Sequence, residues 1–262
     1  MARLPSAVGA HVPRRRFGQN FLVDRTVVER IVEAIAPAPS DTIVEIGPGQ
    51  GALTQPLLQC VAHLHAVEID RDLAAELRAR FPPDRLTLHE ADALRFDFPA
   101  LGNSLRIVGN LPYNISSPLL FRLADALDCI RDCHFMLQRE VVERMAAAPG
   151  GKTYGRLSIM LQYRFSVERL FRVAPGSFRP VPRVDSAVVR LTPLRPQPIA
   201  ARDDNVFARV VGEAFSHRRK TLRNALRSMV PEPAFAAAGI DADLRPEMLS
   251  VAQFVRLADA IA

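Results

Sequence analysis

The chain has 262 residues, of which 48% are hydrophobic, and its formal net charge is +6. That apolar content is enough for a real core, while no uninterrupted apolar run approaches the ~18 residues of a membrane span. Cys129 and Cys133 could face the same way on a helix, but the only other cysteine, Cys60, does not supply the second pair of a metal site, which favours reduced thiols. We therefore expect a cytoplasmic protein that binds neither a membrane nor a metal.

The chain begins with a basic stretch, since residues 1–16 contain four arginines and no acid. They lack the apolar core of a secretory signal, so we expect residues 1–13 to be a flexible tail. Short apolar runs then alternate with helical patterns. The predicted strands are residues 42–46, 64–69, 86–88, 105–108 and 134–137, and the predicted helices include 72–80 and 118–127. This alternation is typical of a parallel sheet covered on both faces.

Two later strands are predicted at residues 166–173 and 186–192, joined by a proline-rich segment. They are expected to form an antiparallel edge on the same sheet. Three prolines in residues 193–198 mark a change of composition, beyond which the pattern is helical only. The predicted helices there are 203–215, 221–229, 233–238 and 250–261, the last with a capping box at Ser250 and Gln253. We expect an α/β, Rossmann-like domain in residues 1–195 and a small all-helical C-terminal domain in 196–262.

A glycine-rich stretch, residues 45–51, follows the first predicted strand and precedes a helical segment. Such glycines allow a tight turn and the close approach of a ligand to a helix N-terminus. Glu68 ends the next strand, where a carboxylate can accept both hydroxyls of a ribose. Asp92 follows the third strand and can accept from an adenine amino group, although position alone does not separate it from Glu90 or Asp97. The spacing also fits a dinucleotide-binding dehydrogenase, because NAD and S-adenosylmethionine share the ribose.

The fourth predicted strand ends in Asn110, Leu111, Pro112 and Tyr113. This set places an amide, a rigid backbone carbonyl and an aromatic face together, which suits a flat base held by its amino group. Two acceptors that take the N–H bonds of adenine favour a more tetrahedral nitrogen with a free lone pair. Catalysis can then come from orientation, without a titrating base.

Basic residues are gathered in two segments. Residues 152–195 hold nine basic side chains against two acids, and residues 218–227 hold five and no acid. Clusters of this kind are the usual electrostatic footprint of a nucleic-acid-binding protein.

Together these residues resemble the ribosomal RNA adenine dimethyltransferases, and within them the small-subunit enzyme that dimethylates two adjacent adenines near the 3′ end of 16S rRNA. The resemblance covers the chain from about Arg14 onward. It rests on residues 16–22, 45–51, Glu68, Asp92, 110–118, 151–155, 178–186 and 218–224. Each motif could occur by chance, whereas their order and spacing together are highly specific.

The resemblance implies a Rossmann-like methyltransferase that uses S-adenosylmethionine. The residues it assigns to the cofactor are Gln19, Asn20, Leu22, Gly47, Gly49, Gly51, Glu68, Asp92 and Asn110. The target amino group would meet Asn110 and the carbonyl of Leu111 or Pro112, with Tyr113 stacking on the base and Phe178 as a second stacking face. RNA contacts are assigned to Arg218, Arg219, Lys220 and Arg223.

The expected activity is N6,N6-dimethylation of two adjacent adenines of 16S rRNA during small-subunit assembly, by a monomer. The alternatives are a large-subunit rRNA dimethyltransferase, a non-catalytic RNA-binding assembly factor and a dehydrogenase.

Overall fold

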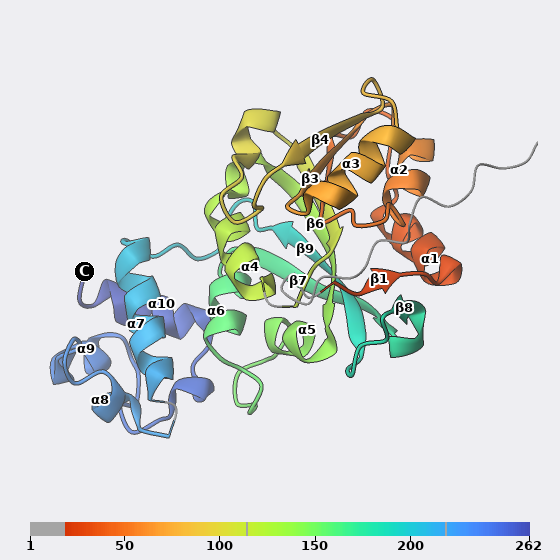
Figure 1. Cartoon of the computed structure of the whole chain (residues 1–262). Helices are drawn as coiled ribbons and strands as arrows, with labels where there is room; N and C mark the ends of the chain where they lie inside the picture. The colour runs from red at the N-terminus through yellow and green to blue at the C-terminus, as the bar shows by residue number, and fades with distance from the viewer. Residues whose placement is uncertain (1–18, 114, 218) are drawn as a thin grey trace, which may run out of the picture.

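The order of the strands in the main sheet reverses beside the strand of that sheet that comes first in the chain. The computed structural model describes residues 19–113, 115–217 and 219–262 (Figure 1). Within them a seven-stranded sheet has the order β4-β3-β2-β5-β6-β9-β7. Its strands are β2 (Ile43–Ile46), β3 (Leu64–Glu68), β4 (Leu86–Glu90), β5 (Leu105–Asn110), β6 (Ile130–Gln138), β7 (Phe165–Val173) and β9 (Ser186–Pro193). The strands from β4 to β6 are parallel, and β9 is antiparallel to both of its neighbours.

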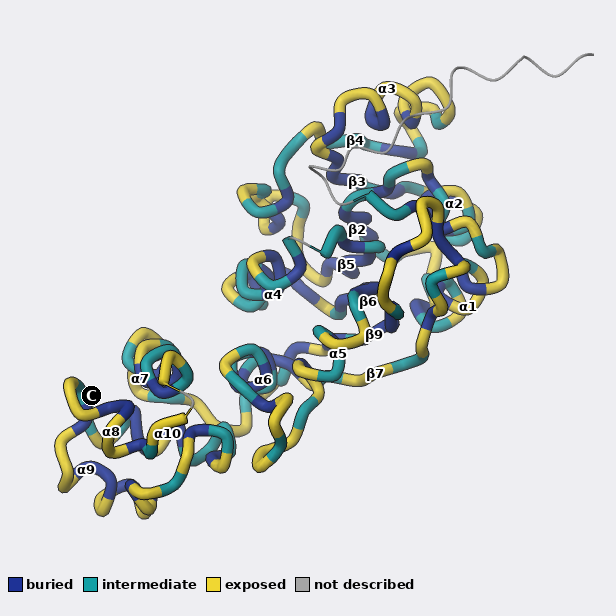
Figure 2. The backbone as a smooth tube through the Cα atoms, turned by 60° about the horizontal axis from the view of Figure 1, so that its bottom comes forward, coloured by how far each residue is buried: buried dark blue, intermediate teal, exposed yellow. Residues whose placement is uncertain are grey.

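Helices cover both faces of this sheet. The helices are α1 (Arg25–Ile35), α2 (Thr54–Cys60), α3 (Arg71–Arg80), α4 (Ser116–Asp125), α5 (Arg139–Met145) and α6 (Arg156–Gln162). Side chains of α1, α2 and α3 pack with Val108 of β5 in one apolar cluster, while α4 and α5 pack with Ile107 in another. Neighbouring residues of a strand point to opposite faces, so a parallel strand must be apolar on both. Figure 2 shows these central strands buried beneath helices whose outer faces are exposed.

The sequence predicts all these strands, with errors of a few residues at their ends. The pair β7 and β9 is antiparallel as expected, but only β7 is an edge strand, because β9 lies between β6 and β7. A second sheet was not expected: β1 (Phe21–Leu22) pairs with β8 (Phe178–Arg179), and Val23 N donates to Ser177 O at 2.9 Å. The predicted tail, residues 1–13, lies outside the described residues.

The C-terminal lobe is helical, with α7 (Asp204–Ser216), α8 (Leu222–Ala225), α9 (Glu232–Ala237) and α10 (Val251–Asp259). The capping box of Ser250 and Gln253 is confirmed. The helix predicted over 221–229 is wrong in length, because α8 ends at Ala225 and a turn follows.

The core of the helical lobe begins before residue 196. Tyr154, Ile159 and Tyr163 are buried in the same apolar cluster as α7 and α10. The Tyr163 hydroxyl donates to Asp204 at 2.5 Å and accepts from Ala201 N at 2.9 Å. Helix α6 thus packs beside α7 while its other side chains reach the sheet lobe (Figure 1). A domain division at residue 196 remains a prediction, and a cut there would remove part of this core.

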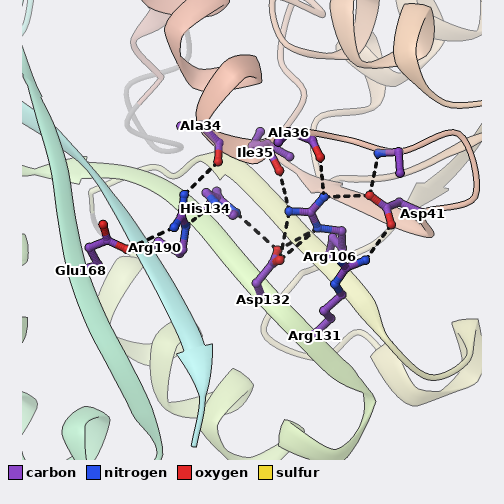
Figure 3. A network of polar contacts seen from close by, with 11 residues as sticks. Ala34, Ile35, Ala36, Asp41, Arg106, Arg131, Asp132, His134, Glu168 and Arg190 are labelled. Carbon is purple, nitrogen blue, oxygen red and sulfur yellow. Dashed lines mark hydrogen bonds and ion pairs between the residues drawn. The ribbon is translucent and has the colours of Figure 1, made fainter.

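A buried arginine joins helix α1 to the amino-terminal end of the sheet (Figure 3). Arg106 of β5 donates to Asp132 at 3.0 Å, to Asp41 at 2.7 Å and to the carbonyls of Ile35 and Ala36 at 2.5 and 3.2 Å. The last carbonyls of a helix have no partner within it, and these contacts supply one. Although burial opposes it, hydrogen bonds from Arg106 and its neighbours lower the pKa of both carboxyl groups.

Replacing this arginine would leave Asp132 without its arginine partner and Asp41 with only the exposed Arg131. We expect Arg106→Leu to reduce the free energy of unfolding by about 3–5 kcal/mol, measured by urea denaturation. The control is Arg131→Leu, because Arg131 also pairs with Asp41, at 2.9 Å, but its side chain is 55% exposed. It should cost less than about 1 kcal/mol. Equal losses in the two variants would contradict the role given to burial.

Candidate functional site

A pocket opens where β2, β3, β4 and β5 end. In a parallel sheet, ligands bind outside the carboxyl ends of the strands where the strand order reverses, which here lies between β2 and β5. The sequence-predicted residues that line this pocket are Gln19, Asn20, Leu22, Gly47, Gly49, Glu68, Asp92, Asn110, Leu111, Pro112 and Tyr113. Two of the predicted residues, Gly51 and Phe178, do not line it.

The glycine turn follows β2 directly. Gly49 has φ of 56°, and a Cβ on it would lie 3.1 Å from the Phe21 ring, so both its backbone and its surroundings require glycine. Gly51 also has a positive φ, of 80°, but a Cβ on it would lie 3.1 Å from Leu77 Cδ2 of α3. The prediction of Gly51 as a cofactor contact is therefore corrected: this glycine lets the turn pack against α3.

Glu68 lies at the end of β3 and is 5% exposed. One of its carboxyl oxygens accepts from Asp70 N at 2.9 Å and the other from Gly49 N at 3.2 Å. Burial raises the pKa of Glu68, although these backbone bonds oppose the shift. A carboxylate has about four lone-pair sites, so Glu68 keeps acceptor capacity for a ligand hydroxyl.

The structure separates the three acids near the end of β4. Asp92 lines the pocket and accepts from Leu94 N at 2.9 Å. Glu90 instead pairs with Arg78 on the surface, and neither it nor the exposed Asp97 lines the pocket. Beside Asp92 the pocket is apolar, because Ile69 lies in its lining and is 49% exposed. A carboxylate next to an apolar surface suits a purine ring and its amino group.

Asn110 ends β5 with its side chain in a fixed orientation. Its Nδ2 donates to the backbone carbonyl of Asn20 at 2.9 Å, which leaves Oδ1 as an acceptor. Pro112 O already accepts from Ile115 N at 3.2 Å and from Ser116 Oγ at 3.1 Å. No donor within the described ranges reaches the carbonyl of Leu111. The structure therefore favours Leu111 over Pro112 as the second acceptor.

Tyr113 stands beside these acceptors with its hydroxyl tied to Ser186. The two oxygens lie 2.8 Å apart, and Ser186 is fully buried at the start of β9. Burial raises the pKa of Tyr113, so the hydroxyl is protonated at neutral pH. The contact fixes the plane of the ring. We call Asn110, Leu111 and Tyr113 the target-base corner.

Phe178 is not a stacking face in this structure. Its side chain is fully buried and packs in the apolar cluster that contains Leu22 and Val173. The reason is its strand pairing, because β8 lies antiparallel to β1 with Phe178 opposite Leu22. The prediction for Phe178 is corrected to that of a core residue under the N-terminal segment.

Acidic side chains offset part of the positive charge of the basic cluster at residues 218–227 in the helical lobe. Arg223 pairs with Glu232 and with Asp243, the latter at 3.2 Å. Arg219 and Lys220 are exposed on the surface, and Arg218 lies outside the described residues. Acids distant in sequence therefore pair with Arg223 and offset its charge, and its assignment to RNA stays a prediction.

Sequence reasoning missed two residues of the pocket lining and one residue that supports it. Asp70 is 1% exposed, caps α3 and accepts from Gln19 Nε2 at 3.1 Å. Ile69 provides the apolar wall, and Glu45 lies in the pocket lining while 2% exposed. Glu45 and Asp70 carried a signal, since an acid inside an apolar strand and an acid before a helix both suggest a local role.

Within the described part of the chain, no group of three or more His, Cys, Asp or Glu residues could hold a metal ion. None of the described helices is long and apolar enough to cross a membrane. The expected monomer and the expected cytoplasmic location stay predictions.

The Rossmann-like sheet, with its pocket at the carboxyl ends of the strands, is a fold that this chain shares with solved methyltransferases. Among solved structures, a dimethyladenosine transferase from Plasmodium falciparum is 26% identical with a TM-score of 0.78, covering 90% of this chain and 95% of that one. The 23S rRNA methyltransferase ErmE is 26% identical with a TM-score of 0.72, covering 92% and 99%.

The family model for ribosomal RNA adenine dimethylase matches residues 10–262. The Ribosomal RNA small subunit methyltransferase A of Aromatoleum aromaticum is 57% identical, covering 96% of this chain and 95% of that protein. Its namesake in Thiobacillus denitrificans is 59% identical, covering 93% and 96%. The chain belongs to the ribosomal RNA adenine dimethylase family. The resemblance inferred from the motifs is confirmed, and the dehydrogenase alternative is set aside.

Glu45 makes the stability of the protein depend on pH. Its carboxyl accepts from Thr54 Oγ1 at 2.6 Å, but burial and the charge of Glu68 raise its pKa to about 7. Because the pKa is higher in the folded than in the unfolded chain, the resulting stability is present at low pH and is lost as pH rises through 7.

We expect Glu45→Gln, which stays neutral, to lose less free energy of unfolding between pH 5 and pH 8 than the wild type. The shift from 4.5 to about 7 sets an upper limit of about 3 kcal/mol on this difference. Urea denaturation of the cofactor-free protein at several pH values measures it, with Glu90→Gln as the exposed control. If Glu45→Gln and the wild type follow the same pH curve, Glu45 does not titrate in this range.

Proposed function

We propose that this protein transfers methyl groups from S-adenosylmethionine to the exocyclic amino nitrogens of two adjacent adenines near the 3′ end of 16S rRNA. The observation that carries the proposal is the hydrogen bond from Asn110 Nδ2 to Asn20 O. This bond uses the amide NH2 group and leaves the amide oxygen to accept from the target amine. Family membership supports the reaction. The names of relatives at 52–59% identity favour the small-subunit RNA over the large-subunit alternative.

The residues present fit the expected cofactor. Glu68 would hold the ribose hydroxyls, Asp92 the adenine amino group and Gly47 with Gly49 the methionine part. Two of the pocket's carboxylates, Glu45 and Glu68, suit a ligand that carries positive charge. When bound, S-adenosylmethionine supplies an electrophilic methyl group on a sulfonium.

The amine of adenine is a poor nucleophile because its lone pair is delocalised into the ring. Asn110 Oδ1 and Leu111 O would each accept one N–H bond, which favours a tetrahedral nitrogen and frees the lone pair. Both acceptors are fixed before the substrate arrives, so little reorganisation is needed at the moment of reaction. The displaced proton passes to solvent, and the one remaining N–H permits a second transfer.

Tyr113 would hold the plane of the base. Taking a base out of its stack costs a few kcal/mol, and an aromatic contact is worth roughly 1–3 kcal/mol. Since Phe178 is buried, Tyr113 is the aromatic face that this corner offers. The hydrogen bond to Ser186 keeps that ring in place and reduces the entropy lost on binding.

The decisive experiment is mass spectrometry of 16S rRNA from small subunits that lack the modification, after incubation with the protein and labelled cofactor. We expect two dimethylated adenines with the wild type. Asn110→Ala should lose about 100-fold or more in kcat, because it removes an acceptor that acts on the reacting amine. Its cofactor affinity should change less than about tenfold.

Asn205→Ala, at the exposed start of α7, is the matched control and should retain full activity. Full turnover by Asn110→Ala would refute the role of the corner. A wild-type protein that binds the subunit without modifying any adenine would instead favour the assembly-factor alternative.

The basic cluster gives a separate prediction about RNA binding. Phosphate contacts make affinity fall steeply with salt, so replacing Arg219 and Lys220 with alanine should weaken binding and flatten the slope of log affinity against log salt by about 1–2. Arg223→Ala should change that slope little, because Arg223 already pairs with two acids. Filter binding at several salt concentrations measures both. The reverse ranking would show that Arg219 and Lys220 only face solvent.

A further inference from the structure

The connection from β8 to β9 has both of its ends at the target-base corner. At its start, Phe178 pairs with Leu22 in the short segment whose Asn20 carbonyl holds Asn110. At its end, Ser186 bonds the hydroxyl of Tyr113. Residues 179–184, here called the proline loop, are therefore suspended between the element that orients the acceptor and the element that orients the aromatic ring.

The proline loop exposes apolar side chains that most proteins would bury. Val181 is 57% exposed and Val184 is 44% exposed. Both valines are among the six large hydrophobic residues that are exposed in the described chain, and Val184 also lines a hollow against the loop. Two exposed apolar side chains on one short loop suit a surface that is covered during function.

The loop is also basic and pre-shaped. Arg179 and Arg183 are exposed, and Arg183 makes no ion pair with any described residue. Asp185, the acid that follows them, forms ion pairs with Arg172 at 2.9 Å and with Arg139 at 3.6 Å. Two prolines stiffen the loop, and Pro182 is buried. The Arg179 guanidinium donates to the carbonyls of Gly176 and Phe178, which leaves Arg183 as the loop's cation for a ligand. Valines beside such a guanidinium form a surface that can pack on a base and bind its phosphate.

A hollow of about 350 Å³ lies against this loop, and Gln138, Arg183 and Val184 are part of its lining. Strand register relates it to the corner. Met136 stands opposite Asn110, and Gln138 stands opposite Ser186 two residues further along β6. Two residues of strand span roughly 7 Å. By this register, the hollow lies about two strand residues beyond the target-base corner and next to the proline loop.

We propose that the proline loop and this hollow form a subsite for the RNA nucleotide adjoining the target adenine. The inference rests on the proposed function and names the part of the substrate that the loop recognises. Withdrawing one base from a strand uncovers the face of its neighbour. Val181 and Val184 cover that face, and Arg183 binds the adjoining phosphate. Phe178 remains beneath the loop as its support.

The first test compares the double variant V181S/V184S with the wild type on small subunits that lack the modification. The KM for the subunit should rise about tenfold, while kcat and the thermal shift caused by S-adenosylmethionine stay unchanged. R183A should also raise KM. The matched control is I199S/R202A, which removes an exposed apolar side chain and an exposed arginine from the inter-lobe connection. An unchanged KM in V181S/V184S overturns the subsite.

The second test does not depend on the stability of the serine variants. Val181→p-benzoylphenylalanine is irradiated on the same subunits and the crosslinked nucleotide is mapped. The crosslink should fall within two nucleotides of a methylated adenine, and the same probe at Ile199 should give none there. Crosslinks elsewhere, or none, overturn the subsite. If the wild type leaves every adenine unmodified, the proposed function fails and the subsite with it, whereas methylation with unaffected variants refutes the subsite alone.

Discussion

The pocket depends on parallel strands that end at the same edge of the sheet. Because β2, β3, β4 and β5 run in one direction, the residues that follow them meet there although they are far apart in sequence. The hydrogen bond from Asn110 to Asn20 then adds the N-terminal segment to this edge. The cofactor pocket and the target-base corner are therefore built together, because the N-terminal segment that lines the pocket also orients Asn110 in the corner.

Buried carboxylates at the two ends of the sheet have different partners. At the amino end, Asp41 and Asp132 each have an arginine partner, so their charges are balanced within the protein. At the carboxyl end, Glu45 and Glu68 accept bonds from a hydroxyl and from backbone N–H groups, and no basic side chain of the described chain pairs with either. A buried carboxylate without a counter-charge is costly. That cost suits a site whose positive partner arrives with the ligand.

Residues whose role follows from their place along a strand could be predicted from the sequence. Glu68 and Asp92 were found in this way, because an acid after a parallel strand lies at the ligand edge. Residues whose role depends on distant pairing could not. Phe178 is buried because β8 pairs with β1, more than 150 residues earlier, and Arg223 is neutralised by acids that fold back onto it. Local sequence shows neither the direction of a side chain nor the charges brought to it by the fold.

Helix α6 takes part in both cores, with Leu161 in the sheet lobe and Ile159 in the helical one. The lobes are thus joined by shared packing as well as by the chain that connects them. The distance between Tyr113 and the exposed Lys220 is consequently set by the fold. Under the proposed function, in which Tyr113 holds the extruded purine and Lys220 meets a phosphate, this distance would fix how far apart those two groups lie on a bound RNA.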